Sequence, residues 1–292
     1  MVDLTTFLAP HPDTLSVDQV HPVIRLRDIK TGYRPYHKPW SYYFRSLFMF
    51  HNETFNIWTH LIGTFMIAYY TYVCAAASTE RDSQVILAYG FCSTFCHLAS
   101  TVAHWFGALS PTSYKRIFLF DFIGVAMNSF GMHTVMLQTT TDARFLQLCG
   151  PYAIPGVLLL NTCTASLLCY GGIVSIRSVR LRAITLVIPN TASAVICAIP
   201  VFTRIYHRLT TRDIHVIPDY HLENEIFFLV IIQVSLMIAS IIFYGSHFPE
   251  RCRHCTFDIL GSSHQLFHIG VTLFCLWFNN HCTEIYTRYI QI

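Results

Sequence analysis

Two histidines, His264 and His268, stand four residues apart in the stretch GSSHQLFHIGV, near the start of a long apolar run. Residues i and i+4 of an α-helix lie on the same face, so both imidazoles can reach one ion. Zinc is often bound by imidazole nitrogens, and three protein ligands with one open position are typical of catalytic zinc sites. The pair therefore predicts a third ligand from a facing helix.

The third predicted ligand is His97, which lies in a different apolar segment. Both segments are predicted membrane-spanning helices. Counted from their predicted cytoplasmic ends at 1.5 Å per helical residue, the three histidines lie at a depth of about 9–15 Å. Asp121, the one acidic residue predicted inside a span, lies at a depth of about 10 Å. We therefore predict a zinc site with ligands His97, His264 and His268. Asp121 is the predicted partner of zinc-bound water or of a ligand ring, and Ser93, one turn before His97, has the same supporting role.

Other histidines within apolar segments have a different interpretation. Ionisable groups inside a membrane are costly unless they are paired or hydrated, so each one needs an explanation. A single intramembrane histidine more often makes a hydrogen bond between helices than it binds a metal. This interpretation is assigned to His60, His104, His133 and His281.

The segments that carry these residues are long and apolar. Of the 292 residues, 53% are hydrophobic and 12% are charged, whereas soluble domains have about 25% charged residues. A membrane helix needs about 20 mostly apolar residues. Seven predicted spans meet this length, at residues 54–79, 83–114, 122–141, 145–176, 183–203, 226–249 and 259–283. The third span is expected to begin before Asp121 and the fourth to start after Pro151. The sequence therefore predicts an all-α membrane protein, folded as a bundle of seven transmembrane helices.

The loop charges predict the orientation of this bundle. With a cytoplasmic N-terminus, thirteen of the 19 Lys and Arg residues fall on the cytoplasmic side and six on the other. Because positively charged loops stay in the cytoplasm, this bias predicts a cytoplasmic N-terminus and an extracellular C-terminus. That orientation is the reverse of a G-protein-coupled receptor. The net charge of +3 is small and dispersed, so no nucleic-acid partner is predicted.

The predicted organisation follows from these spans. Aromatic and apolar residues recur at helical spacing before the first span, which is typical of an amphipathic helix lying at the membrane surface. The predicted parts are a cytoplasmic N-terminal segment (1–38), an interfacial amphipathic helix (39–53), the seven-helix domain (54–286) and a short extracellular tail (287–292).

Several motifs resemble the progestin and adipoQ receptor family, which is related to haemolysin-III-like membrane proteins. They are GYRPY and SLFMFHNETFNIWTHLIG before and in the first span, STFCH in the second, LFDFIGVA in the third, and PERCRHCTFDILGSSHQLFH leading into the seventh. By position, the resemblance implies zinc bound by His97, His264 and His268, with Asp121 contacting the zinc-bound water and Ser93 accompanying it. It also implies the same inverted seven-helix topology. GYR and NETFNIWTHL favour the progestin-receptor branch, whereas His51 and the three histidines favour the adiponectin-receptor branch.

The resemblance implies two functions that can be one mechanism. The first is a zinc-dependent, ceramidase-like hydrolase, in which zinc lowers the pKa of bound water to ~7 and a ceramide-type lipid amide enters from the bilayer. The second is a plasma-membrane receptor for a steroid or protein hormone, in which zinc is structural. A non-catalytic regulator of membrane lipids is the third alternative. The sequence contains no motif that identifies the ligand or an oligomeric state.

Overall fold

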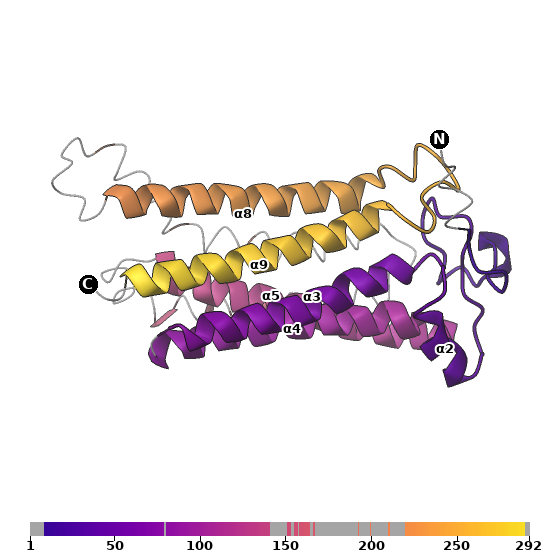
Figure 1. The fold of residues 1–292 in the computed structure, drawn as a ribbon, viewed down its shortest axis with the longest axis horizontal. Coiled ribbons are helices and arrows are strands. Elements are labelled where there is room, and N and C mark those ends of the chain that lie inside the picture. Colours follow the sequence, from indigo (N-terminus) through magenta and orange to yellow (C-terminus); the bar gives the residue numbers. More distant parts are fainter. Residues whose placement is uncertain are drawn as a thin grey trace. The chain divides into compact units, whose positions relative to one another are not determined.

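The computed structural model describes residues 9–78, 80–140 and 220–289, with isolated helical residues between 151 and 210. The long helices are α3 (Thr54–Ala76), α4 (Glu80–Phe106), α5 (Pro111–Thr140), α8 (Tyr220–Ser246) and α9 (Ser263–Tyr289) (Figure 1). The short elements are η1 (Val17–Gln19), α2 (Trp40–Ser46) and η2 (Gly107–Leu109). These residues contain no strand beyond an isolated bridge between Leu15 and Tyr33. The predicted all-α class is therefore confirmed for the described residues.

Five of the seven predicted spans coincide with long helices, which are α3, α4, α5, α8 and α9. The other two, 145–176 and 183–203, lie largely outside the described residues. Among the described residues, the stretch Ser83–Leu109 is long and apolar enough to cross a membrane, and Val234–Ser246 is a shorter apolar stretch. The seven-span topology and the sides of the termini stay predictions.

The first residues of helix α5 are typical of a helix N-terminus. Pro111 occupies the first helical position, where its missing N–H removes no helical hydrogen bond. Ser110 precedes it, and the Ser110 hydroxyl accepts a hydrogen bond from the backbone N–H of Ser113 at 3.0 Å. This N-terminal cap starts the helix at Pro111, so Asp121 lies inside it, as expected.

Helix α9 is capped by a residue from the preceding loop. The buried Glu250 carboxylate accepts hydrogen bonds from the backbone N–H of Ser263, at 2.7 Å, and from the Ser263 hydroxyl. An acidic group at this end also complements the helix dipole. The same loop holds the N-terminal segment, because Asp258 accepts hydrogen bonds from the backbone N–H groups of Lys30 and Thr31 at 3.0 and 2.7 Å.

Helix α2 is shorter than the predicted amphipathic helix 39–53. It ends at Ser46, and its buried side includes Tyr43, which is fully inaccessible. Trp40 and Phe44, which the spacing places on the same face as Tyr43, are 60% and 53% exposed. The Tyr43 hydroxyl donates to backbone carbonyls, so this ring is held inside while its aromatic neighbours face outward. The membrane-surface location of the segment stays a prediction.

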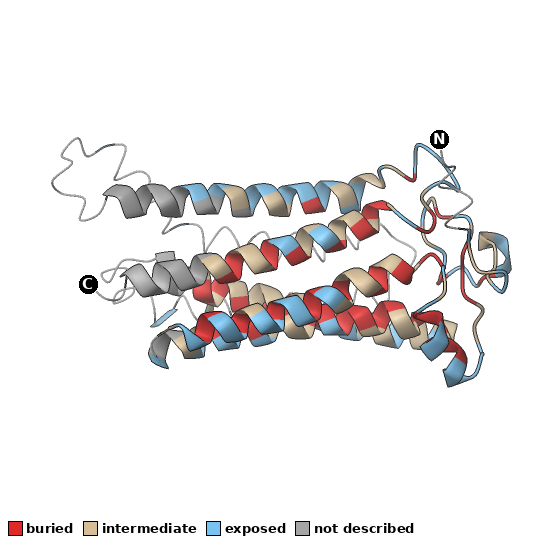
Figure 2. Ribbon diagram, in the orientation of Figure 1, coloured by how far each residue is buried: buried red, intermediate tan, exposed pale blue. Residues whose placement is uncertain are grey.

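The chain divides into two compact units. The first comprises Met1–Met66, Thr94–Gly124 and Leu236–Phe274, and the second comprises Ile67–Ser93, Val125–Ser235 and Cys275–Ile292. Buried positions recur along α3, α4 and α9, alternating with exposed ones (Figure 2). The histidines of the predicted metal site all belong to the first unit.

Candidate metal centre

Five imidazoles from three helices form one group in the first unit, here called the histidine cluster. His60 comes from α3, His97 and His104 from α4, and His264 and His268 from α9. The His60 ring stacks on that of His268 with centroids 3.6 Å apart and lies 4.7 Å from that of His97. The rings of His104 and His264 lie 4.9 and 4.5 Å from that of His268. All members except the partly buried His264 are buried.

Three members of the cluster have the geometry of a metal site. His104, His264 and His268 each offer a ring nitrogen, and these nitrogens all lie within 4.8 Å of one another. The Nε2 atoms of His104 and His264 are 3.3 Å apart. Ligands at 2.0–2.1 Å from a tetrahedral zinc ion are about 3.4 Å from each other. The three rings therefore fit a zinc ion with small adjustments.

The structure brings together two of the three sequence-predicted ligands and adds a different third ring. His264 and His268 lie in the group of three, as their spacing predicts. His97 is fully buried in the same cluster, where its Nε2 lies 3.2 Å from the Thr272 hydroxyl. The third ring of the compact group is His104, which the sequence interpretation assigned to helix packing.

A repeated motif in α4 could have pointed to His104. The spacing Ser-x-x-x-His occurs twice, as Ser93–His97 and as Ser100–His104, seven residues apart. Seven residues are close to two helical turns, so both histidines lie on the same face. The sequence interpretation used the first element, and the structure brings the histidine of the second to the α9 pair.

The two predicted supporting residues, Asp121 and Ser93, belong to different units. Asp121 is partly buried on α5, and its carboxylate interacts with the Ser100 hydroxyl and with His104. Ser93 is fully buried and belongs to the second unit, where it interacts with the Cys275 thiol. Ser100 therefore has the place beside Asp121 that the sequence interpretation gave to Ser93.

Glu53 is a further polar residue of the site. Its carboxylate Oε2 lies 2.7 Å from Nδ1 of His104 and accepts a hydrogen bond from the Asn56 side chain at 2.6 Å. Burial alone raises the pKa of the Glu53 carboxyl, but its interactions with the His104 ring and the Asn56 side chain hold that pKa at about 2. The group is therefore an ionised acceptor at neutral pH.

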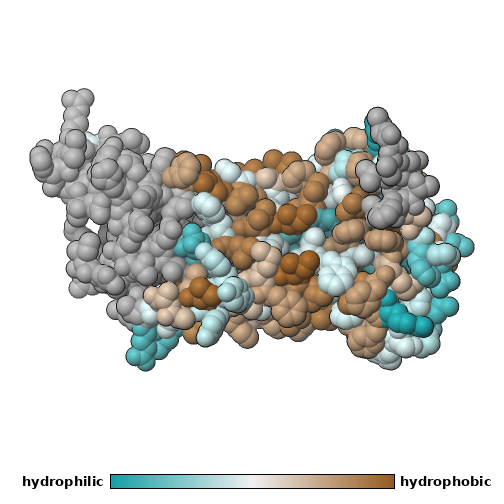
Figure 3. All heavy atoms as spheres, in the orientation of Figure 1, coloured by the Kyte–Doolittle hydropathy of each residue, from teal (hydrophilic) through white to brown (hydrophobic). Residues whose placement is uncertain are grey.

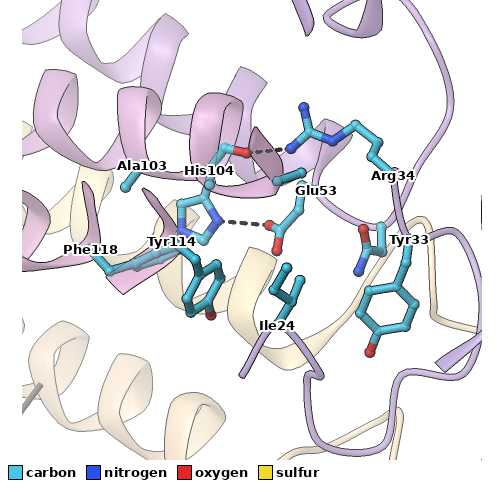
Figure 4. A pocket seen from close by; sticks show the side chains of 11 residues that line it. Ile24, Tyr33, Arg34, Glu53, Ala103, His104, Tyr114 and Phe118 are labelled. Atoms are coloured by element: carbon cyan, nitrogen blue, oxygen red, sulfur yellow. Dashed lines mark hydrogen bonds and ion pairs between the residues drawn. The ribbon is translucent and has the colours of Figure 1, made fainter. Parts of the chain in front are cut away.

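A small cavity lies beside His104 and Glu53. Its lining includes Tyr33, Arg34 and Phe118, and Figure 4 shows Glu53 between the His104 ring and the Arg34 side chain. The cavity is large enough for one water molecule, because the space open to the centre of a water molecule is about 20 Å³. Burial lowers the pKa of the Arg34 guanidinium to about 10, so it stays charged and balances the Glu53 carboxylate.

The fold and the histidine group define an all-α protein with a buried candidate metal centre, and the comparisons with known proteins place it in a family. Residues 48–278 match the model of the haemolysin-III related family, and the chain belongs to this family. It is 30% identical over 275 residues to membrane progestin receptor alpha of Cynoscion nebulosus, covering 90% of this chain and 73% of the relative. It is 28% identical over 267 residues to membrane progestin receptor gamma of Homo sapiens, covering 90% and 78%. The resemblance to the progestin and adipoQ receptor family is thereby confirmed.

Proposed function

We propose that this chain is a multi-pass membrane receptor with a zinc centre in its histidine cluster, which couples a steroid or protein hormone to hydrolysis of a ceramide-type lipid amide. The observation that carries the proposal is the group of three ring nitrogens within 4.8 Å of one another. Imidazole is a borderline ligand that suits zinc, and three such ligands leave one position open for water or substrate.

Exposed apolar side chains support the membrane assignment. They recur on one side of α3 at intervals of three and four residues, and much of the described surface visible in Figure 3 is hydrophobic. These α3 residues are Ile62, Phe65, Met66, Tyr69, Tyr72 and Val73. A stripe of this size is unusual on a soluble monomer and suits contact with lipid. The proposed location is the plasma membrane, with a cytoplasmic N-terminus and an extracellular C-terminus.

The proposed ligands are His264 and His268 together with one histidine of α4. The geometry favours His104 as the third ligand, because its Nε2 faces that of His264. The sequence favours His97, whose Nε2 is near Thr272. Both residues belong to the cluster, and substitution of each in turn separates their roles.

The side chains around the cluster can support hydrolysis. Zinc, when bound, supplies a water of pKa ~7 and polarises the substrate carbonyl. Asp121 would orient that water and accept its proton, since its carboxylate lies near His104. The Ser100 hydroxyl would hold the Asp121 carboxylate in place. The lipid amide would reach these groups from the surrounding bilayer.

The receptor part of the proposal rests on the relatives. The relatives from Cynoscion nebulosus and Homo sapiens are both named membrane progestin receptors. We therefore favour a steroid over a protein hormone as the class of ligand. The alternative is a non-catalytic receptor or regulator of membrane lipids in which zinc is structural. Burial of most of the cluster among three helices favours this alternative, because a metal there would hold α4 and α9 together.

Metal content and activity of one purified sample test the proposal. Zinc per chain is measured in wild type and His264→Ala, and fatty-acid release from ceramide is measured in wild type and Asp121→Ala. We expect one zinc in wild type, loss of zinc in His264→Ala, and retained zinc without fatty-acid release in Asp121→Ala. Zinc without any hydrolysis in wild type would leave the structural-zinc alternative standing. Wild type without zinc overturns the proposal.

A further inference from the structure

We infer that the start of α3 orients the metal-binding histidines, with Glu53 as the positioning residue of His104 and Asn56 as that of His268. This inference rests on the proposed metal centre and names residues that act on it without binding the metal. Hydrogen bonds join this segment to histidines of two other helices.

The first contact fixes the protonation of the His104 ring. Nδ1 of His104 lies 2.7 Å from Oε2 of Glu53. The same Oε2 also accepts a hydrogen bond from the Asn56 side chain at 2.6 Å, so this oxygen is an acceptor and Nδ1 of His104 is the donor that carries the proton. The lone pair of the neutral ring is then on Nε2, and this is the atom that faces Nε2 of His264 at 3.3 Å. Glu53 thereby turns the metal-binding nitrogen of His104 toward the other ligands.

The second contact fixes the His268 ring in the same way. Nδ1 of His268 lies 3.2 Å from the backbone carbonyl oxygen of Asn56 and 3.3 Å from the Thr59 hydroxyl. A carbonyl oxygen can only accept, and the Thr59 hydroxyl already donates to the backbone oxygen of Phe55 at 2.7 Å. Nδ1 of His268 therefore carries the proton, and its Nε2 is available to a metal.

The positioning groups are themselves held in place. The Asn56 side chain donates to the same Oε2 of Glu53 at 2.6 Å, so the carboxylate is fixed from a second direction. Glu53 is largely buried, with a side chain that is 12% exposed. The backbone carbonyl of Asn56 belongs to α3 and cannot rotate away. The two ligand rings are thus oriented by one rigid segment at the start of a helix.

Such outer partners have a known effect on metal binding. A histidine that binds a metal usually donates its other ring N–H to a carboxylate or a backbone carbonyl, and loss of that partner costs about 10- to 100-fold in metal affinity. The two contacts of α3 supply one partner of each kind. Glu53 should therefore control zinc affinity although it lies on the side of His104 away from the other ligands.

The experiment compares zinc dissociation constants, measured by competition with a chelating dye, for the purified full chain. We expect Glu53→Ala to weaken zinc binding about 10- to 100-fold. Glu53→Gln keeps an acceptor oxygen without the charge, so it should weaken binding less than Glu53→Ala. Added formate should restore part of the affinity of Glu53→Ala by replacing the lost carboxylate. Glu80→Ala removes an exposed carboxylate of α4 and should leave the dissociation constant unchanged.

The outcomes separate this inference from the proposed function. Wild type without zinc overturns both. If wild type and Glu53→Ala bind zinc with equal dissociation constants, the positioning role is contradicted, and the proposed metal centre is unaffected. If Glu53→Ala does not fold, then Glu53→Gln decides, because an affinity equal to that of wild type contradicts the inference. The visible spectrum of bound Co²⁺ gives a second readout, which should keep its tetrahedral bands in Glu53→Gln.

Discussion

His97 and His104 each end a Ser-x-x-x-His element of α4, and the two can be separated by matched substitutions. We expect His104→Gln to abolish stoichiometric zinc binding, because its ring nitrogen lies within 4.8 Å of those of His264 and His268. His97→Gln should retain zinc, since the ring contacts Thr272 and His60. Zinc per chain measured by mass spectrometry checks both variants. The reverse result would restore the ligand set predicted from the sequence.

The buried His51 makes stability depend on pH. Burial lowers the pKa of His51 well below its usual value, and the nearby Arg34 charge lowers it further, while the Glu53 charge opposes this shift. As pH falls below about 6.5, the unfolded chain binds a proton that folded His51 does not, so folded stability decreases. Protonation would also break the hydrogen bond that Nδ1 accepts from the Glu53 N–H at 3.1 Å.

The measurement is the thermal midpoint between pH 7.5 and 5.5, with a His51→Gln variant. We expect the midpoint of wild type to fall with pH more steeply than that of His51→Gln. His254 is exposed in a loop, so His254→Gln should keep the wild-type slope. Equal slopes in wild type and His51→Gln would contradict the assignment.

At the residue scale, local spacing predicted the pair and missed its partners. His264 and His268 are four residues apart on one helix, so their common direction follows from helix geometry alone. The estimated depth selected His97, which lies about 10 Å from His104 along the axis of α4. Both residues lie on one face of α4, so the ring that meets the α9 pair is decided by helix packing. Glu53 contacts His104 across 51 residues of sequence, and no local pattern encodes that pairing.

At the element scale, Gly63 allows α3 to approach α4 and α9. A Cβ atom at this position would lie 2.9 Å from the His97 ring and 2.9 Å from the Thr272 hydroxyl. Gly63→Ala should therefore push the helices apart and cost about 1–3 kcal/mol of stability, as overpacking does. Gly245→Ala in α8 meets nothing within 4 Å and should be neutral or stabilising. Thermal midpoints in detergent compare the two variants, and equal midpoints would rule out the close approach.

The helices were predictable and their ends were less so. Long apolar runs predicted α3, α4, α5, α8 and α9, because each contains about 20 residues suited to a membrane. The start of α5 at Pro111 lies in a polar segment that a hydropathy window excludes, yet Ser110 and Pro111 are a recognisable capping pair. Helix α2 ends at Ser46, where the backbone oxygens of Ser46 and Leu47 lie 3.0 Å from His51 Nε2 and 2.9 Å from Trp58 Nε1.

At the scale of the whole molecule, metal removal should lower stability. The candidate ligands belong to α4 and α9, which are separated by more than 150 residues of sequence, so a bound ion links distant parts of the chain. A ligand that binds the folded state at 100 times its dissociation constant stabilises it by about 2.7 kcal/mol. We therefore expect chelation to lower the thermal midpoint of wild type and to leave that of His264→Ala unchanged. A midpoint of wild type insensitive to chelator would contradict a metal that links α4 and α9.

Composition and loop charge predicted the class of the molecule, and the family comparison confirmed the resemblance carried by its motifs. The N-terminal segment was predicted only as a cytoplasmic stretch. Its order comes from partners far along the chain, since Asp258 binds the backbone of Lys30 and Thr31. Such pairings arise from tertiary packing and leave no periodic pattern in the sequence.

The Arg34 guanidinium has a consequence for how the molecule can be regulated. It donates to the backbone oxygens of His104, at 2.6 Å, and of Trp105, at 2.7 Å, at the end of α4. The backbone of His104, whose ring faces the α9 histidines, is thus hydrogen-bonded to the N-terminal segment. Coupling between two sites is reciprocal. A partner that displaces this segment should change metal affinity, and metal binding should slow amide hydrogen exchange around Arg34 by the same linkage.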